Sequence, residues 1–385
     1  MSVTAAQGFE AAGVAVALKS TGKPDVAVVV NRGPLKVGAA VFTSNRAKAN
    51  PILWSQQAVA DGIVEAVVLN SGGANCFTGP FGFQTTHQTA EKAAELLGVS
   101  AGDVLVCSTG LIGTGDEVFR AKVLDGTAQA IAALSADGGA AASEAIMTTD
   151  TVPKRAVVTR DGWTVGGMAK GAGMLAPGLA TMLVVITTDA VLTSEEADAQ
   201  LRAATRRTFD RLDSDGCMST NDQVTLLVSG ASGIRPDAEA FAAALAEVSQ
   251  SLAVQLQADA EGASHDIAIR VVNAASEEDA VTVGRSVARN NLFKAAIFGN
   301  DPNWGRVLAA IGTTDAAFDP YDVDVSFNGV RVCTAGGPDR PREEVDLTPR
   351  ATDILIDLRV GDAAATILTN DLTHDYVHEN SAYSS

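Results

Sequence analysis

The chain has 385 residues, of which 46% are hydrophobic but only 5% are aromatic. This length exceeds what one hydrophobic core usually supports, so we expect a composite α/β protein filled mainly by Val, Ala, Leu and Ile. The formal net charge of -18 argues against nucleic acid and anionic membrane surfaces as partners, because both require clustered Lys and Arg.

The cysteines and the N-terminal stretch indicate the cellular compartment. Four scattered cysteines include no C-x-x-C pair, which is typical of a reduced protein without a structural zinc site. The N-terminal stretch lacks a basic leader before its apolar part and carries Glu10 inside it, which does not fit a secretory signal. No apolar run reaches membrane-spanning length. We therefore expect a cytoplasmic protein with no membrane partner.

The first half of the chain alternates apolar runs with Ala-rich helical stretches, a pattern typical of layered α/β architecture. The strands and helices expected here start near the following residues: Asp25, Gly38, Val64 and Asp103 for strands, and Thr89 and Glu117 for helices. A hairpin that turns at Asp161-Gly162 follows, and then a strand that begins at Thr181.

The second half continues with a polar helix opened by Ser194 and a long helix from about Pro236 to Glu261. A strand, one helical stretch and further strands follow, which we interpret as a compact lobe. We expect a layered α/β core over residues 1–255 and a smaller α/β C-terminal lobe with a tail over residues 256–385. No internal repeat or low-complexity linker separates them, so the lobes should pack together.

Thr181 stands between a Pro/Gly-rich loop and the pattern of a buried strand. A threonine hydroxyl needs a base to act as a nucleophile, and none of the four histidines falls in a Ser/His/Asp or Cys/His signature. If the bond between Ala180 and Thr181 were cut, the freed amine, with a pKa of about 8, would lie within reach of the same residue's hydroxyl. The simpler alternative is a β-branched residue that opens a strand.

Eight short motifs stand out along the chain. They are LNSGGAN at 69–75, CSTGLIG at 107–113, MTTDTVPK at 147–154, MAKGAGMLAPGLATML at 168–183, LDSDGCMSTND at 212–222, QADAEG at 257–262, FGNDPNWGRVLAA at 298–310 and NSAYSS at 380–385. Together they closely resemble the ornithine acetyltransferase (glutamate N-acetyltransferase) family of arginine biosynthesis over nearly the whole chain. The resemblance implies that the Ala180-Thr181 bond cleaves itself into an α chain of residues 1–180 and a β chain that begins with the nucleophile Thr181.

The resemblance also assigns roles to single residues. Thr109 and Gly110 would stabilise the oxyanion of acyl transfer. Lys170 would bind substrate, as a cation suited to a free α-carboxylate, and Glu261 would bind substrate by pairing with an ammonium group. From the residues alone, the Ser-Thr-Gly sequence also fits a plain turn and Glu261 a frayed helix end. Lys170 equally fits a solvated surface lysine, because the glycines around it cannot shield it.

Three further positions match substrate contacts in the resembling family, namely Thr149, Asn380 and Ser385. The adjacent Thr148 is nearly indistinguishable from Thr149 by sequence. A polar tail such as HENSAYSS is by default disordered, so the resemblance implies that the C-terminus folds back over the site.

The implied activity is a ping-pong acetyl transfer. Thr181 would take the acetyl group from N-acetylornithine and pass it to glutamate, without a metal or redox cofactor, and acetyl-CoA remains open as a further donor. The two chains would stay associated, as a heterotetramer of two α and two β chains. One alternative is an amidase or aminopeptidase on a similar self-processing scaffold, and another is an uncleaved α/β protein that binds a small anionic or zwitterionic metabolite.

Overall fold

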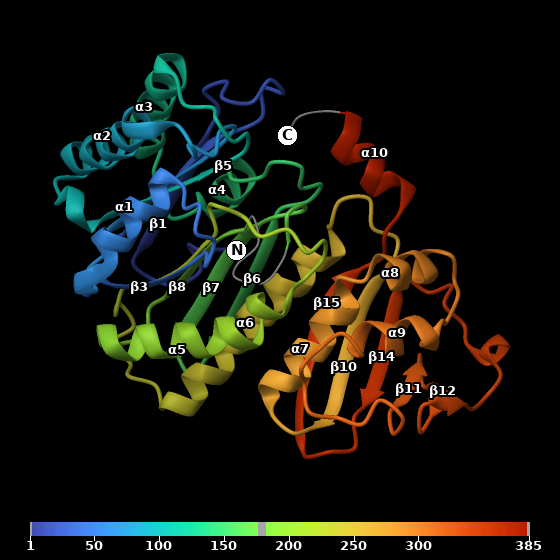
Figure 1. Ribbon diagram of the computed structural model, residues 1–385. Helices are drawn as coiled ribbons and strands as arrows, with labels where there is room; N and C mark the ends of the chain where they lie inside the picture. Colours follow the sequence, from blue (N-terminus) through green and yellow to red (C-terminus); the bar gives the residue numbers. More distant parts are fainter. Residues whose placement is uncertain (1, 176–181, 383–385) are drawn as a thin grey trace.

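The chain folds into layers around three β-sheets, as the computed structural model shows for residues 2–175 and 182–382 (Figure 1). The first two sheets stack face to face and helices cover their outer faces, while the third sheet belongs to a smaller part at the C-terminal end. This architecture confirms the layered α/β fold class that the sequence predicts.

The first sheet contains four strands in the spatial order β1 (Phe9–Val14), β2 (Val26–Asn31), β4 (Ala66–Ser71) and β5 (Val104–Thr109). β4 and β5 run parallel, so both end at the same edge of the sheet. Every residue of β2, β4 and β5 is buried, because these Val-rich runs are covered on both faces. The outer face is covered by helices α1 (Asn50–Ala58), α2 (Gly79–Leu97) and α3 (Glu117–Ala132).

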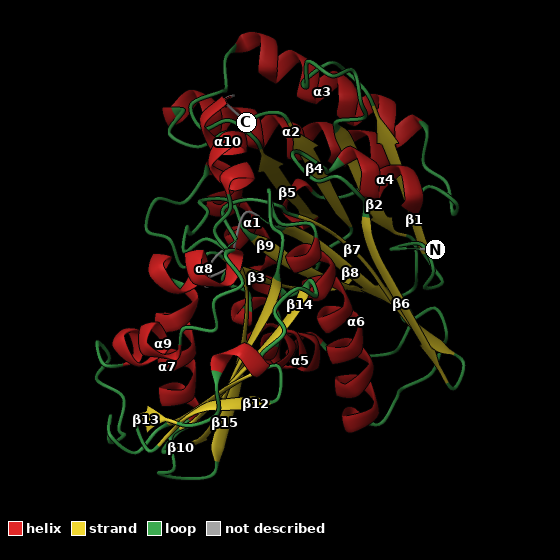
Figure 2. Ribbon diagram, turned by 90° about the vertical axis from the view of Figure 1, so that its right-hand side faces the viewer, coloured by secondary structure: helices red, strands yellow, loops and turns green. Residues whose placement is uncertain are grey.

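The second sheet contains five strands in the order β3 (Val37–Phe42), β9 (Gln223–Val228), β8 (Leu183–Thr188), β7 (Trp163–Lys170) and β6 (Lys154–Arg160). Its inner face packs against the first sheet through a shared core that includes Leu69, Met168 and Val185. Helix α4 (Gly139–Ala145) packs against β1 and β2. Helices α5 (Ser194–Arg207) and α6 (Ala238–Ala258) cover the outer face, on the side opposite α2 and α3 (Figure 2).

The third sheet has the strand order β13 (Gly337–Pro338), β12 (Val330–Thr334), β11 (Asp324–Phe327), β14 (Ala351–Asp357), β10 (Asp266–Ala274) and β15 (Ala363–Asn370). Buried and partly exposed residues alternate along β14, so one face forms a core under the helices α7 (Glu277–Ala288), α8 (Asn291–Phe298) and α9 (Trp304–Ile311). Helix α10 (His374–Ala382) follows β15. The short 3-10 turns are Val59–Asp61, Ala101–Asp103, Phe209–Arg211 and Arg342–Glu344.

Most of the predicted elements are present, with three kinds of difference. Helix α2 begins at Gly79 rather than Thr89, because Pro80 suits a first helical turn and the threonines along the helix bond their hydroxyls to carbonyls one turn back. The single helical stretch expected after Ser276 is broken into α7 and α8, since the Asn290 side chain caps Phe293 N-H. The elements β1, α1, α4, β9, β13 and α10 were not predicted.

The hairpin between β6 and β7 turns at Asp161-Gly162, as predicted. Asp161 has φ 45° and Gly162 has φ 87°, and two successive positive values are what a two-residue hairpin turn requires. The hairpin positions Lys170 at the far end of β7.

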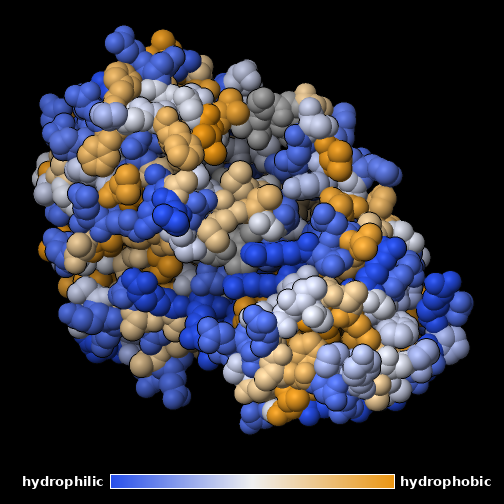
Figure 3. Space-filling model, viewed as in Figure 1, coloured by the Kyte–Doolittle hydropathy of each residue, from blue (hydrophilic) through white to orange (hydrophobic). Residues whose placement is uncertain are grey.

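The surface is polar where the two parts meet. Figure 3 shows hydrophilic residues gathered across the junction between the stacked sheets and the third-sheet part, with hydrophobic residues scattered elsewhere on this face. Within the described residues, no helix combines the length and the apolar character needed to cross a bilayer.

Candidate active site

A cavity of about 350 Å³ lies at the edge of the second sheet, near the end of β5. Six of the residues that the sequence predicts line it together, namely Thr109, Gly110, Thr149, Lys170, Glu261 and Asn380. They come from segments far apart in the chain. The predicted residues Ala180, Thr181 and Ser385 lie outside the described residues.

Thr109 is the last residue of β5 and Gly110 follows it, and both line one wall of the cavity. Gly110 has φ 123°, and a Cβ at this position would lie 2.6 Å from Gly73 N, so the backbone here requires glycine. The N-H groups of Gly72 and Gly73 both donate to Thr109 O at 2.9 Å. The glycine-rich turn of the LNSGGAN motif thus fixes the backbone that presents the Thr109 hydroxyl and Gly110.

Lys170 is the last residue of β7 and is only 1% exposed. The expectation that glycines leave it unshielded is therefore wrong, because segments distant in sequence enclose it. Its Nζ donates to Thr109 Oγ1 at 3.2 Å. Since that oxygen accepts a hydrogen bond from Lys170, the hydroxyl proton of Thr109 is available for another acceptor. Burial lowers the pKa of Lys170 from 10.5, although the Asp150 carboxylate acts in the opposite direction.

Asp150 is a buried carboxylate that sequence reasoning missed. Its Oδ1 accepts from Lys154 Nζ at 2.6 Å and from Gly171 N at 2.7 Å, and its Oδ2 accepts from Thr148 N at 2.9 Å. Burial acts to raise the pKa of Asp150, but Lys170 and Lys154 outweigh it and bring the pKa to about 2. Asp150 therefore balances Lys170 and holds the Thr148-Thr149 loop. Both threonines line the cavity, so this arrangement does not choose between them.

Glu261 lines the same cavity as Lys170. It lies in a loop and not at a helix end, because α6 ends at Ala258. The expectation that the long helix runs to Glu261 is therefore wrong. Glu261 N donates to Ala172 O at 2.9 Å, and a Cβ on Gly173 would lie 2.4 Å from the Glu261 carboxylate. Glycine at 173 thus allows the glycine-rich segment to pass directly against this carboxylate.

Asn380 contacts Glu261 from helix α10, since its Nδ2 donates to Glu261 Oε2 at 3.0 Å. As far as residue 382, the C-terminal segment is therefore helical and lies over the cavity, as the resemblance implies.

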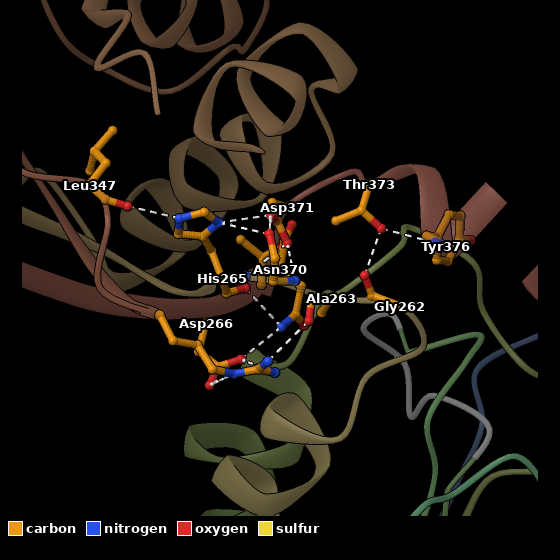
Figure 4. A network of polar contacts seen from close by, with 12 residues as sticks. Gly262, Ala263, His265, Asp266, Leu347, Asn370, Asp371, Thr373 and Tyr376 are labelled. Carbon is orange, nitrogen blue, oxygen red and sulfur yellow. Dashed lines mark hydrogen bonds and ion pairs between the residues drawn. The ribbon is translucent and has the colours of Figure 1, made fainter. Parts of the chain in front are cut away.

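A network of polar contacts holds the Glu261 loop against α10 (Figure 4). The Asp371 carboxylate bonds His265 Nδ1 at 2.8 Å and accepts from His265 N at 3.0 Å, while His265 Nε2 lies 2.9 Å from Leu347 O. Thr373 Oγ1 donates to Gly262 O at 2.6 Å and accepts from Tyr376 N at 2.9 Å. The contacts of Asp371 with His265 and of Thr373 with Gly262 join residues over a hundred positions apart, so they fix the distance between Glu261 and the tail.

Asn221 lines the same cavity and Asp222 follows it in the chain; both are buried, and sequence reasoning gave neither a role. Asn221 Nδ2 donates to Ala74 O at 2.6 Å and to Ser108 O at 2.8 Å, which joins the two stacked sheets. Asp222 Oδ1 accepts from Met182 N at 3.1 Å, and burial raises the pKa of Asp222 well above 3.8. Both residues lie in the LDSDGCMSTND motif, so this motif was the sequence feature that could have indicated a role for them.

One small cavity is thus surrounded by a buried cation (Lys170), a carboxylate (Glu261), and hydrogen-bond donors from the Thr109 hydroxyl and the Gly110 backbone. Such a set suits a zwitterionic ligand with a carbonyl to be polarised. Across residues 2–175 and 182–382, no group of three or more His, Cys, Asp or Glu side chains is arranged to hold a metal ion.

Comparison with known proteins identifies the family. The model of the ArgJ family matches residues 10–385. The arginine biosynthesis bifunctional protein ArgJ of Streptomyces coelicolor is 64% identical over 385 residues, which is all of both chains. The ArgJ protein of Mycobacterium leprae is 53% identical over 391 residues, covering 100% of this chain and 96% of the relative.

Among solved structures, the chain is similar to an ornithine acetyltransferase complexed with ornithine from Mycobacterium tuberculosis. The two are 49% identical with a TM-score of 0.45, over 47% of this chain and 96% of that one. The ArgJ structure from Bacillus halodurans is 31% identical with a TM-score of 0.49, over 52% of this chain and 98% of that one. The full-length sequence matches confirm the resemblance seen in the motifs, and the chain belongs to the ArgJ family of arginine-biosynthesis enzymes.

Proposed function

We propose that this enzyme cuts itself between Ala180 and Thr181 and then uses Thr181 to transfer an acetyl group from N-acetylornithine to glutamate. The observation that carries the proposal is the convergence of Thr109, Gly110, Lys170 and Glu261 on one cavity of about 350 Å³. Met182, the residue after Thr181, is held by the buried Asp222.

Self-cleavage supplies a base directly beside the Thr181 hydroxyl. The Thr181 hydroxyl attacks the Ala180 carbonyl carbon, and the C-N bond breaks, so that the Thr181 amine is freed and takes up the hydroxyl proton. Water then hydrolyses the resulting ester, which releases the Ala180 carboxylate and restores the Thr181 hydroxyl. An α-amine has a pKa of about 8, so it accepts a proton near neutral pH.

Acetyl transfer then proceeds in two halves. Thr181 Oγ attacks the acetyl carbonyl of N-acetylornithine, its own amine takes the hydroxyl proton and passes it to the leaving nitrogen, and ornithine departs. The Thr109 hydroxyl and Gly110 N-H stabilise the oxyanion. The glutamate amine next attacks the acetyl ester and restores Thr181. Lys170 binds the α-carboxylate, and Glu261 binds the side-chain ammonium of the ornithine part.

The dependence on glutamate tests this proposal. Incubation of the enzyme with N-acetylornithine should yield acetylglutamate when glutamate is added and little acetate without it. Rapid release of acetate regardless of glutamate would favour the amidase alternative. Binding of N-acetylornithine without any turnover would favour the metabolite-binding alternative.

The Thr109 hydroxyl should contribute to kcat. A Thr109→Val variant keeps the side-chain shape but loses the hydroxyl donor, so we expect kcat to fall about 10²-fold, the usual cost of one oxyanion donor. Steady-state kinetics measures the change. The Thr109→Ser variant retains the hydroxyl and should stay within about tenfold of the parent. An unchanged kcat in the valine variant would remove Thr109 from the oxyanion role.

Glu261 should discriminate between the two substrates. In Glu261→Gln the carboxylate charge is lost while the size is kept, so we expect the KM for N-acetylornithine to rise about 10- to 100-fold. The KM for glutamate should change less, because glutamate carries no side-chain ammonium. Asp375→Asn removes an exposed carboxylate from the first turn of α10 and is the matched control. Equal losses for both substrates would contradict this role.

The order of the second sheet supports the proposal that the cleaved chains stay together. β8 and β9, which would belong to the β chain, are paired with β7 and β3 of the α chain.

We propose that two such pairs of α and β chains assemble into a heterotetramer and act in the cytoplasm, where the four free cysteines stay reduced. We also propose the division into 1–255 and 256–385, since α6 packs on the second sheet and β10 opens the third.

A further inference from the structure

Asp222 is a fully buried carboxyl group that uses only one of its two oxygens. Its Oδ1 accepts from Met182 N at 3.1 Å, whereas its Oδ2 has no hydrogen-bond partner among the residues that the structure describes. Burial raises the pKa of Asp222 well above 3.8, although the Met182 N-H and Lys170 act in the opposite direction. A buried polar oxygen without a partner is unusual in a folded protein, so we looked for a donor that is present at another stage.

The backbone around Asp222 is held in a fixed position. Thr43 N donates to Asp222 O at 3.0 Å, and Thr43 Oγ1 donates to Ser219 O at 2.7 Å. The side chain of the preceding residue, Asn221, donates to two backbone carbonyls and joins the two stacked sheets. Because the backbone is anchored in this way, the carboxyl group has little freedom to turn toward a different partner.

The segment that contains Asp222 also holds the chain on both sides of the proposed cleavage site. On the side before the site, Ser214 N donates to Leu175 O at 2.5 Å. On the side after it, Gln223 N donates to Met182 O at 3.2 Å. Ser214, Asp222 and Gln223 would all belong to the β chain, so both sides of the cut would stay attached to one segment after cleavage.

Covalent geometry brings the nitrogen of Thr181 close to this carboxyl group. Three bonds separate the nitrogens of Thr181 and Met182, so the two atoms lie only about 3 Å apart. An anion that accepts from one backbone N-H is well placed to accept from the nitrogen before it, as anions do at successive N-H groups. Before cleavage this nitrogen is an amide with a single hydrogen, whereas the freed ammonium carries three. Self-cleavage therefore supplies new donors next to Asp222 Oδ2.

We propose that Asp222 is the positioning residue of the Thr181 amine, with Oδ2 accepting a hydrogen bond from the amine after cleavage while Oδ1 keeps Met182 in place. This inference rests on the proposed function. A free chain end would otherwise rotate, and the hydrogen bond keeps the amine in one position beside its own hydroxyl. The carboxylate also stabilises the ammonium form that arises when the amine takes the hydroxyl proton, because the two charges are opposite. Asp222 itself forms no covalent bond in the reaction.

The Asp222→Asn variant tests this role. Its amide oxygen can still accept from Met182 N, so the chain should fold and cut itself, which intact-mass measurement checks. The amide lacks the second acceptor and the charge, so we expect kcat per cleaved molecule to fall about 10- to 100-fold, while the KM for N-acetylornithine changes less than about threefold. The ammonium form loses its stabilising charge, so the fall of kcat at acid pH should move about one unit toward lower pH.

Asp213→Asn is the matched control. Asp213 belongs to the same motif, is also fully buried, and has one oxygen without a partner among the described residues. Its other oxygen pairs with Arg289 at 2.7 Å, and neither residue lines the cavity of about 350 Å³. This variant should lower the temperature of unfolding and leave kcat and its pH profile unchanged. Asp222→Glu keeps the carboxylate, so it should be more active than Asp222→Asn although it is bulkier.

The outcomes separate this inference from the proposed function. Cleaved Asp222→Asn with an unchanged kcat and pH profile would overturn the role of Asp222 and leave acetyl transfer by Thr181 intact. A folded Asp222→Asn chain that stays uncut would also overturn it, because the carboxylate would then act before the amine exists, and so would a glutamate variant less active than the asparagine variant. A parent enzyme that neither cuts itself nor transfers acetyl groups would overturn the proposed function. A lower kcat with a shifted pH profile in Asp222→Asn, and in Asp213→Asn neither change, supports the role.

Discussion

A Thr181→Ala variant is expected to remain one full-length polypeptide and to lose acetyl transfer by at least about 10⁴-fold, the scale seen when a catalytic nucleophile is removed. This variant should lose both self-cleavage and acetyl transfer, because the same hydroxyl cuts the chain and accepts the acetyl group. Intact-mass measurement reports the first loss, and an assay of acetylglutamate formation reports the second. The fold should survive, since β8 begins after this position at Leu183 and its residues are buried in the sheet.

Thr181→Ser is the matched control, because serine keeps a hydroxyl beside its own amine. It should be cut and should turn over at a measurable rate. If Thr181→Ala were still cut into two chains, another group would have to be the nucleophile of cleavage. If it were uncut but fully active, the free amine would have no part in catalysis.

Lys170→Met is expected to lower kcat/KM about 10²- to 10³-fold, because it leaves the substrate carboxylate in a buried site without its cation. The loss should appear mainly in KM for both N-acetylornithine and glutamate, since each has an α-carboxylate. Asp150 keeps Lys154 as a partner at 2.6 Å, so the folded state should persist. Steady-state kinetics and thermal unfolding together separate the two effects.

Lys154→Met provides the comparison. Lys154 pairs with the same Asp150 and with Asp259 but does not line the cavity, so its loss should reduce stability more than it raises KM. The pH profile gives a second readout. Lys170 binds a carboxylate only while protonated and burial lowers its pKa from 10.5, so 1/KM should fall at alkaline pH. In Lys170→Arg the fall of 1/KM should occur at higher pH, because arginine stays protonated. If the fall occurs at the same pH as in the parent enzyme, Lys170 does not bind the substrate carboxylate.

Much of the site was predictable because its residues lie in short motifs. Thr109 ends a Val-rich strand and Gly110 follows it, and the positive φ of Gly110 explains why a glycine stands there. The burial of Lys170 was not predictable, because its neighbours in sequence are glycines and the groups that enclose it, such as Thr109 and Asp150, come from other elements. Local sequence therefore indicated which residue types were needed but not their surroundings.

The position of Glu261 shows the same limit. Helical periodicity predicts α6 to continue to Glu261, yet the helix ends at Ala258, where the Asp259 carboxylate turns to Lys154 at 2.5 Å. The contact with Asn380 depends on the network around Asp371, which joins β15, α10 and the loop after α6. Tertiary contacts of this length leave no periodic signal in the sequence.

N-terminal sequencing of purified, active enzyme decides whether a residue in the middle of the chain becomes a new amino terminus. Besides the original N-terminus, a second sequence starting Thr-Met-Leu-Val should appear in proportion to the activity. Preparations that form acetylglutamate at full rate while every molecule is still joined through Ala180-Thr181 would contradict the proposed mechanism.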